Sequence, residues 1–209
     1  CRQIGEILAR QHSLPCQATL EAFEPLDFHW PDLLRESRKR GVPEIREMLE
    51  KHCGLLCTIQ EENHAAMRKL TGKPCISNGD MDIKNVLWQN GNPFVIDLEC
   101  LDIGHPEREM VMLALMWAGW ETDHWKPENF QAFVESYTAI RGKPENDPAI
   151  LYDSMDVWPE WLHYNVKRAL GIEAQDEEER QLGLRQAQFA MGRVLFSRDI
   201  RQRVLLFLG

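Results

Sequence analysis

Apolar residues recur at helical spacing over most of the chain. Between residues 44 and 70, for example, Ile45, Leu49 and Leu56 fall on one helix face, which is the pattern of an amphipathic helix packed on a core. Together with Pro and Gly at the expected boundaries, this period predicts helices over residues 1–12, 31–39, 44–70, 106–117, 127–141, 155–170 and 176–208. Connections are predicted over residues 13–31, 142–148 and 171–176.

The middle of the chain has a different pattern. Short apolar runs at residues 75–77, 86–89 and 94–98 are separated by Asn, Gly and Asp, which favours strands. Asn90-Gly91 is a strong hairpin-turn signal because both residues tolerate positive φ. A two-residue turn there places Asn85 opposite Ile96, with Asp97 one position beyond. The predicted fold class is therefore α+β, mostly helical, with a small β-hairpin.

The open end of this hairpin is the candidate site. An amide from Asn85 and a carboxylate from Asp97 suit a hard cation such as Mg²⁺, which keeps several waters and bridges substrate phosphates. Asp80 lies five residues before Asn85, where a carboxylate could accept the proton of an attacking hydroxyl. The spacing predicts phosphoryl transfer to an alcohol. The alternative is that Asp80 and Asn85 only form turns and that Asp97 only ends a strand.

The pattern Asp, four residues, Asn, then a strand ending in Asp is that of kinase catalytic loops. Asn78-Gly79-Asp80 and Val95-Ile96-Asp97 resemble the aminoglycoside phosphotransferase family, whose core choline kinase shares. The resemblance implies the C-terminal lobe of a protein-kinase-like fold. It also implies Asp80 as catalytic base, Asn85 and Asp97 as Mg²⁺ ligands, and ATP or GTP as phosphate donor. Asn78 replaces the family's histidine, and its amide could still donate a hydrogen bond.

Four neighbouring residues have less specific interpretations. Lys84 could contact the nucleotide phosphates or be an exposed loop lysine. Glu99, two positions after Asp97, could share its strand face and touch a second metal or an amine, or be an ordinary solvated carboxylate. His105 lacks a partner histidine at metal spacing, which favours a structural role. Glu109 matches the acidic residue that braces the catalytic loop in the family that the chain resembles.

Composition narrows the class of partner. With 24 basic and 33 acidic residues the formal charge is −9, and no basic stripe is present to neutralise nucleic-acid phosphates. An acidic surface suits a cationic small-molecule acceptor. Tryptophans interleaved with carboxylates could line the pocket for such an acceptor. The preferred interpretation is that the indole rings fill the core. The residues are Trp117, Trp120, Trp125, Trp158 and Trp161, with Glu121, Asp123, Asp156 and Glu160.

No segment has the length of a membrane span, since the longest nearly apolar run covers only residues 110–120. The six cysteines show no disulfide spacing and no secretory leader is visible, so we expect a cytoplasmic protein without membrane contact. The sequence does not indicate an oligomeric state.

The resemblance covers essentially all of residues 1–209, as one kinase-like C-terminal lobe. No Gly-rich phosphate loop and no strand lysine for the nucleotide are visible in this sequence. We therefore expect the N-terminal nucleotide-binding lobe to lie outside it, and these residues alone to be inactive. Three functions remain open: an aminoglycoside-type phosphotransferase, a kinase acting on choline, an amino alcohol or a sugar, and a catalytically silent binding module.

Overall fold

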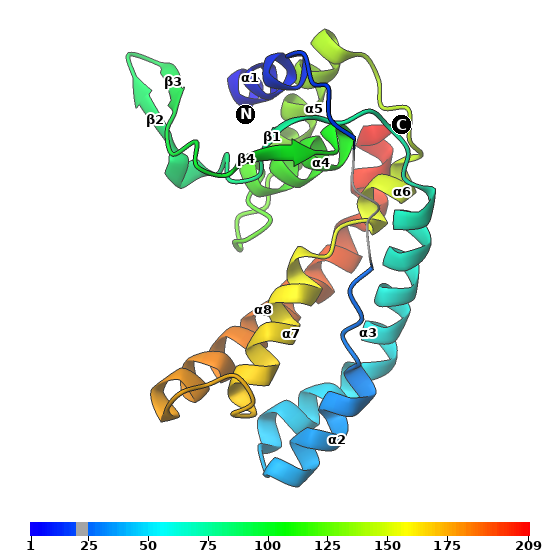
Figure 1. Ribbon diagram of the computed structural model, residues 1–209, viewed down its shortest axis with the longest axis vertical. Helices are drawn as coiled ribbons and strands as arrows, with labels where there is room; N and C mark the ends of the chain where they lie inside the picture. Colours follow the sequence, from blue (N-terminus) through cyan, green and yellow to red (C-terminus); the bar gives the residue numbers. More distant parts are fainter. Residues whose placement is uncertain (20–24) are drawn as a thin grey trace. The chain divides into compact units, whose positions relative to one another are not determined.

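A computed structural model describes residues 1–19 and 25–209 (Figure 1). Residues 20–24, part of the connection predicted over residues 13–31, lie outside this description. The described chain is mostly helical, with two small antiparallel sheets. The predicted α+β class is confirmed, and the chain divides into two compact units, each formed by separate stretches of sequence.

The first unit contains all of the strands and the candidate site. It comprises residues up to 23, Lys69–Met155 and Arg201–Gly209. Its elements are α1 (Arg2–His12), β1 (Cys75–Asn78), the short 3₁₀ helix η1 (Ile83–Asn85), β2 (Val86–Gln89), β3 (Asn92–Val95), β4 (Leu101–Gly104), α4 (Pro106–Trp117), α5 (Pro127–Arg141), α6 (Pro148–Asp153) and the end of α8.

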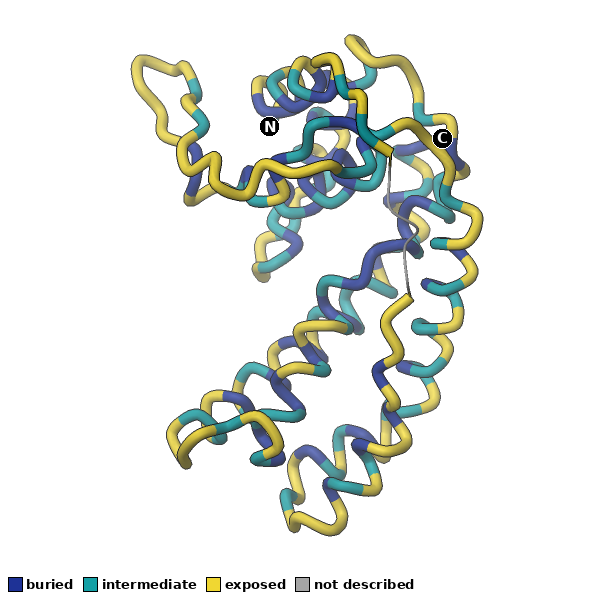
Figure 2. Tube along the Cα trace, viewed as in Figure 1, coloured by how far each residue is buried: buried dark blue, intermediate teal, exposed yellow. Residues whose placement is uncertain are grey.

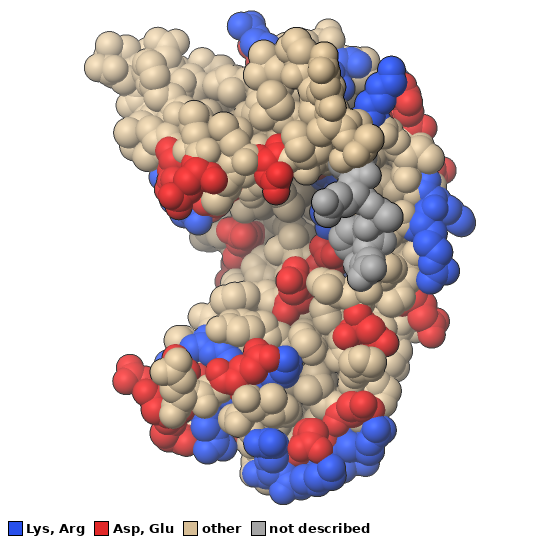
Figure 3. All heavy atoms as spheres, in the orientation of Figure 1, with Lys and Arg blue, Asp and Glu red and all other residues tan. Residues whose placement is uncertain are grey.

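The second unit is entirely helical in its described part. It comprises residues 24–68 and 156–200. Its elements are α2 (Trp30–Arg40), α3 (Pro43–Lys69), α7 (Val157–Ala169) and most of α8 (Glu177–Leu208). The charges of α2 pair among themselves and with α3, for instance Lys39 with Glu36 at 2.7 Å and Arg38 with Glu50 at 3.0 Å. Figure 3 accordingly shows basic and acidic side chains intermixed over α2.

The β2–β3 hairpin has the register that its turn predicts. Val86 pairs with Val95 and Gln89 with Asn92, and the turn residues Asn90 and Gly91 both have positive φ. The hairpin projects from the first unit and is largely exposed (Figure 2). The prediction of a strand through residue 98 is wrong at its end, because β3 ends at Val95.

The second sheet joins β1 to β4, which sequence reasoning did not predict. Cys75 pairs with Gly104 and Asn78 with Leu101. This pairing places the start of β1 beside Gly104, two residues before α4 begins. The core of the unit is built around α4, which packs against α1, α5, α6 and β1. Because α4 is apolar on nearly all sides, it is a buried helix; its buried residues are Pro106, Glu109, Met110, Val111, Leu113, Ala114, Leu115 and Trp117.

None of the described helices combines the length and the hydrophobicity needed to cross a bilayer.

Candidate active site

The loop between β1 and β2 is held by three hydrogen bonds. The Met81 amide donates to the Asn78 carbonyl oxygen at 2.9 Å, which closes a turn. The Met81 side chain is fully buried, and the Trp117 indole N–H donates to its carbonyl oxygen at 3.0 Å. Asp82 then caps η1 by accepting from the Ile83 amide. The backbone on both sides of Asp80 is therefore fixed to the core.

Asp80 and Asn85 meet across this loop. The Asn85 Nδ2 group donates to the Asp80 carboxylate Oδ2 and to the Asp80 carbonyl oxygen, each at 2.8 Å. The other carboxylate oxygen, Oδ1, lies 3.2 Å from the Lys84 ammonium. Both oxygens of Asp80 thus have a partner that fixes their direction, while 35% of the side chain stays exposed.

These contacts also fix the orientation of the Asn85 amide. Because Nδ2 faces Asp80, the amide oxygen Oδ1 points elsewhere, and it accepts no hydrogen bond from the described residues although it is not enclosed. A free amide oxygen next to an oriented carboxylate is a suitable ligand for a hard cation.

Asp97 lies at the open end of the hairpin, beside Asn85. The Ile96 amide donates to the Asn85 carbonyl oxygen at 2.9 Å, so the ladder extends one position beyond β3. Asp97 then adopts a left-handed backbone with φ of 59°, which is uncommon for a residue other than glycine and ends the strand. Its exposed carboxylate makes no hydrogen bond or ion pair with the described residues, so it is available to a ligand.

The surroundings of Asp80 are acidic. Lys84 also lies 4.0 Å from Asp82, and Asp80 raises the pKa of Lys84 by a hydrogen bond and by its charge. Glu121, in the loop after α4, is half-buried. Burial raises the pKa of Glu121, and the charge of Asp82 adds to the effect. Figure 3 shows uncharged side chains over the tip of the β2–β3 hairpin and acidic ones near its base. One ammonium thus stands among three carboxylates.

The sequence model of the phosphotransferase enzyme family matches residues 1–143. The chain belongs to this family. The resemblance seen in the Asn78-Gly79-Asp80 and Val95-Ile96-Asp97 segments is thereby confirmed.

Solved structures show the same fold. The chain is similar to spectinomycin phosphotransferase APH(9)-Ia, solved with ADP and spectinomycin, with a TM-score of 0.64, 15% identity and coverage of 94% of this chain and 64% of that one. It is also similar to an aminoglycoside phosphotransferase from Alicyclobacillus acidocaldarius, with a TM-score of 0.54, 18% identity and coverage of 97% and 65%. The chain therefore spans less than two thirds of the length of these relatives. A comparison with curated protein sequences gives no significant match.

Two sequence predictions near the site need correction. Glu99 cannot share a strand face with Asp97, because both residues follow the end of β3 and Glu99 lies in an exposed turn. Asn78 does not take over as a donor from the family's histidine: it is fully buried, and neither its amide nitrogen nor its amide oxygen has a hydrogen-bond partner among the described residues. The loop is held at this point by the Asn78 backbone instead.

The structural roles predicted for His105 and Glu109 are confirmed. The His105 ring caps α4 by accepting from the Arg108 amide, and its Nε2 lies 2.9 Å from the Thr71 carbonyl oxygen. Glu109 accepts the Asn78 amide at 3.0 Å. In the first unit, Trp117 and Trp120 are buried as core residues. In the second unit Trp158 is buried, whereas Trp161 is 39% exposed.

Proposed function

We propose that the chain is the C-terminal lobe of an ATP- or GTP-dependent phosphotransferase that transfers the γ-phosphate to a hydroxyl group of a small molecule. The observation that carries this proposal is the Asp80 carboxylate, oriented by Lys84 and Asn85 beside two oxygen-bearing side chains, those of Asn85 and Asp97. Phosphoryl transfer to an alcohol requires a base, ligands for a divalent cation and a face that is open to the substrates.

Asp80 is the proposed catalytic base. Each carboxylate oxygen can accept more than one hydrogen bond, so the contacts with Lys84 and Asn85 leave capacity for an acceptor hydroxyl. Because both existing partners come from the same short loop, the carboxylate is oriented before the substrate arrives. Such positioning lowers the barrier more than basicity alone.

Asn85 and Asp97 are the proposed ligands of Mg²⁺. The free Oδ1 of Asn85 and the unpaired, exposed carboxylate of Asp97 are the kind of oxygen ligands that this ion takes. When bound, Mg²⁺ neutralises the charge of the nucleotide phosphates. Lys84, whose ammonium group is 65% exposed, is proposed to contact the phosphates from the other side of Asp80.

A cationic acceptor of the aminoglycoside type fits the site best. Asp82 and Glu121 lie near Lys84, the partner of Asp80, and carry charge that Lys84 only partly balances. These carboxylates would attract ammonium groups and so place a neighbouring hydroxyl near Asp80. Choline and amino alcohols share this charge, whereas a neutral sugar does not.

The nucleotide cleft is proposed to need a second lobe. The 209 residues contain no Gly-rich phosphate loop, and the described strands carry no lysine for the α- and β-phosphates. These parts hold the nucleotide in kinases of this type.

The test uses the complete protein with Mg²⁺, ATP or GTP, and a panel of aminoglycosides, choline, ethanolamine and neutral sugars. We expect nucleoside diphosphate release that depends on a cationic acceptor, and a rate loss of ~10² to 10⁴ in Asp80→Asn. Asp32→Asn, an exposed aspartate on α2, is the matched control and should keep full activity. Unchanged turnover in a folded Asp80→Asn protein would exclude Asp80 as the base, and no transfer to any acceptor would favour the silent binding module.

A further inference from the structure

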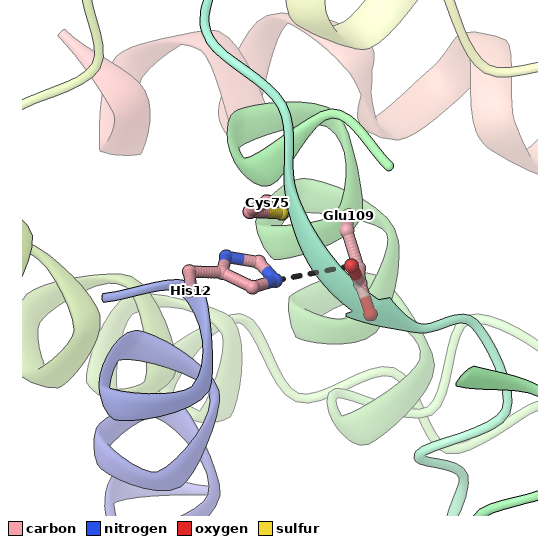
Figure 4. A group of neighbouring side chains, drawn as sticks. All are labelled: His12, Cys75 and Glu109. Carbon is pink, nitrogen blue, oxygen red and sulfur yellow. Dashed lines mark hydrogen bonds and ion pairs between the residues drawn. The ribbon is translucent and has the colours of Figure 1, made fainter. Parts of the chain in front are cut away.

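A buried polar cluster lies behind the catalytic loop. It joins His12, the last residue of α1, to Glu109 in the first turn of α4 and to Tyr137 on α5 (Figure 4 shows the first two with Cys75). His12 is 3% exposed, Glu109 5% and Tyr137 3%. Sequence reasoning assigned no role to His12 or Tyr137.

The cluster is a chain of hydrogen bonds centred on the His12 ring. His12 Nε2 lies 3.0 Å from Glu109 Oε2, and a carboxylate can only accept, so the imidazole donates there. The other ring nitrogen, Nδ1, lies 2.8 Å from the Tyr137 hydroxyl oxygen. Burial raises the pKa of Tyr137, which keeps its hydroxyl protonated.

Glu109 transmits this chain to the loop. Its second oxygen, Oε1, accepts the Asn78 backbone amide at 3.0 Å. The carbonyl oxygen of Asn78 in turn accepts the Met81 amide that closes the turn containing Asp80. Each carboxylate oxygen of Glu109 is therefore committed to one partner, and the loss of one partner would free the carboxylate to rotate.

The same atoms also suit a metal ion, because one ligand atom each from His12, Cys75 and Glu109 lie within 4.8 Å of one another. However, the Cys75 thiol donates to the Gly104 carbonyl oxygen at 3.5 Å. Burial raises the pKa of Cys75 to about 12, whereas metals bind the thiolate. The ligand atoms already have protein partners, and this favours the hydrogen-bonded chain.

We propose that His12 is a positioning residue for the catalytic loop: its imidazole holds the Glu109 carboxylate in the orientation that fixes the Asn78 amide and, through the turn, Asp80. The expected effect on kcat rests on the proposed function. The expected effect on the Asn78 amide rests on the hydrogen bonds alone. A displacement of the base by about 1 Å can lower the rate ~10²-fold. The effect falls on kcat, because no residue of the cluster contacts the proposed nucleotide ligands Asn85 and Asp97.

The test compares His12→Gln with His12→Leu in the complete protein. Glutamine can place an N–H group where the imidazole Nε2 lies, whereas leucine fills similar space without a donor. We expect His12→Leu to lower kcat by ~10- to 100-fold with the KM for ATP changed less than threefold, and His12→Gln to recover most of kcat. Hydrogen exchange at the Asn78 amide should accelerate in His12→Leu and stay slow in His12→Gln.

Three further measurements separate the outcomes. His52→Leu, a histidine on α3 without a hydrogen bond among the described residues, should change neither kcat nor Asn78 exchange. If His12→Leu fails to fold, the deciding measurement is the hydrogen-exchange rate of the Asn78 amide in Tyr137→Phe and His12→Gln. This measurement needs no enzymatic activity, so it remains informative if the proposed function is wrong. Unchanged exchange and kcat in folded His12→Leu, or one equivalent of tightly bound zinc in the purified protein, would overturn the proposal.

Discussion

The carboxyl group of Glu121 lies in surroundings that disfavour a negative charge. Burial, and then the charge of Asp82, raises its pKa above the ordinary value of 4.5. The folded state then binds more protons than the unfolded state, so this group destabilises the fold at neutral pH and the penalty disappears below pH 4.5. We predict that Glu121→Gln raises Tm at pH 7 and that the gain vanishes near pH 4. Glu6→Gln, on the exposed face of α1, is the control, and an equal gain at both pH values would contradict the assignment.

Because the Glu121 carboxylate destabilises the fold and yet lies beside the site, we expect it to take part in binding the acceptor. If Glu121 attracts the acceptor's ammonium group, the same Glu121→Gln variant should raise KM for a cationic acceptor roughly tenfold, which is the loss of one charge-assisted hydrogen bond. The KM for ATP should stay unchanged. Steady-state kinetics at saturating ATP measure both values, and an unchanged acceptor KM would place ammonium recognition elsewhere.

At the scale of elements, the approach of α7 to α8 depends on one glycine. A Cβ atom at Gly183 would lie 2.7 Å from the Ala169 backbone nitrogen and 2.7 Å from the Arg168 Cβ. Backbone cannot move aside cheaply, so Gly183→Ala should destabilise the protein by ~1 to 3 kcal/mol although alanine is the better helix former. Gly192→Ala in the same helix meets no atom within 4 Å and should stabilise by up to ~1 kcal/mol. Urea unfolding of both variants tests the pair, and equal effects would contradict the close approach.

The helices were predictable because their apolar faces repeat over several turns, and α4 and α5 begin and end as expected. The sequence prediction missed α6, since six residues are too few for a period. The N-cap Asp147 followed by Pro148 is the signal that indicates this helix. It also missed β4, because a four-residue strand that pairs with β1 across a long connection has no local signature.

Within the site, too, contacts between residues close in sequence were predictable and contacts between distant residues were not. The meeting of Asp80 with Asn85 follows from a spacing of five residues and a hairpin whose register the turn sets. His12 and Glu109 are 97 residues apart, and no spacing rule connects them. A signal was present in α1, where His12 continues the buried positions of Ile4 and Leu8 at intervals of four. A polar residue in an apolar stripe indicates a buried partner.

At the scale of the whole molecule, folding and catalysis should separate. The 209 residues, produced alone, should fold cooperatively, because each unit buries large apolar side chains, such as Phe130 and Phe133 in the first unit and Leu49 and Leu56 in the second. Phosphate transfer should nevertheless be no faster than in buffer. Asp97 and the Lys84 ammonium are exposed, and water screens such charges strongly. ATP would meet one surface where catalysis requires two.

The same experiment has a second readout in the apolar residues of the β2–β3 hairpin. Leu87 is 56% exposed, Trp88 49% and Phe94 52%, an unusual amount for neighbouring large side chains. If a second lobe or the nucleotide covers this hairpin in the complete protein, Trp88 fluorescence should shift to shorter wavelength there and stay that of a solvated indole in the 209-residue chain. Circular dichroism reports folding and diphosphate release reports catalysis. Robust phosphate transfer by the 209 residues alone, with Trp88 still solvated, would show that Asp80, Asn85 and Asp97 need no second lobe to act.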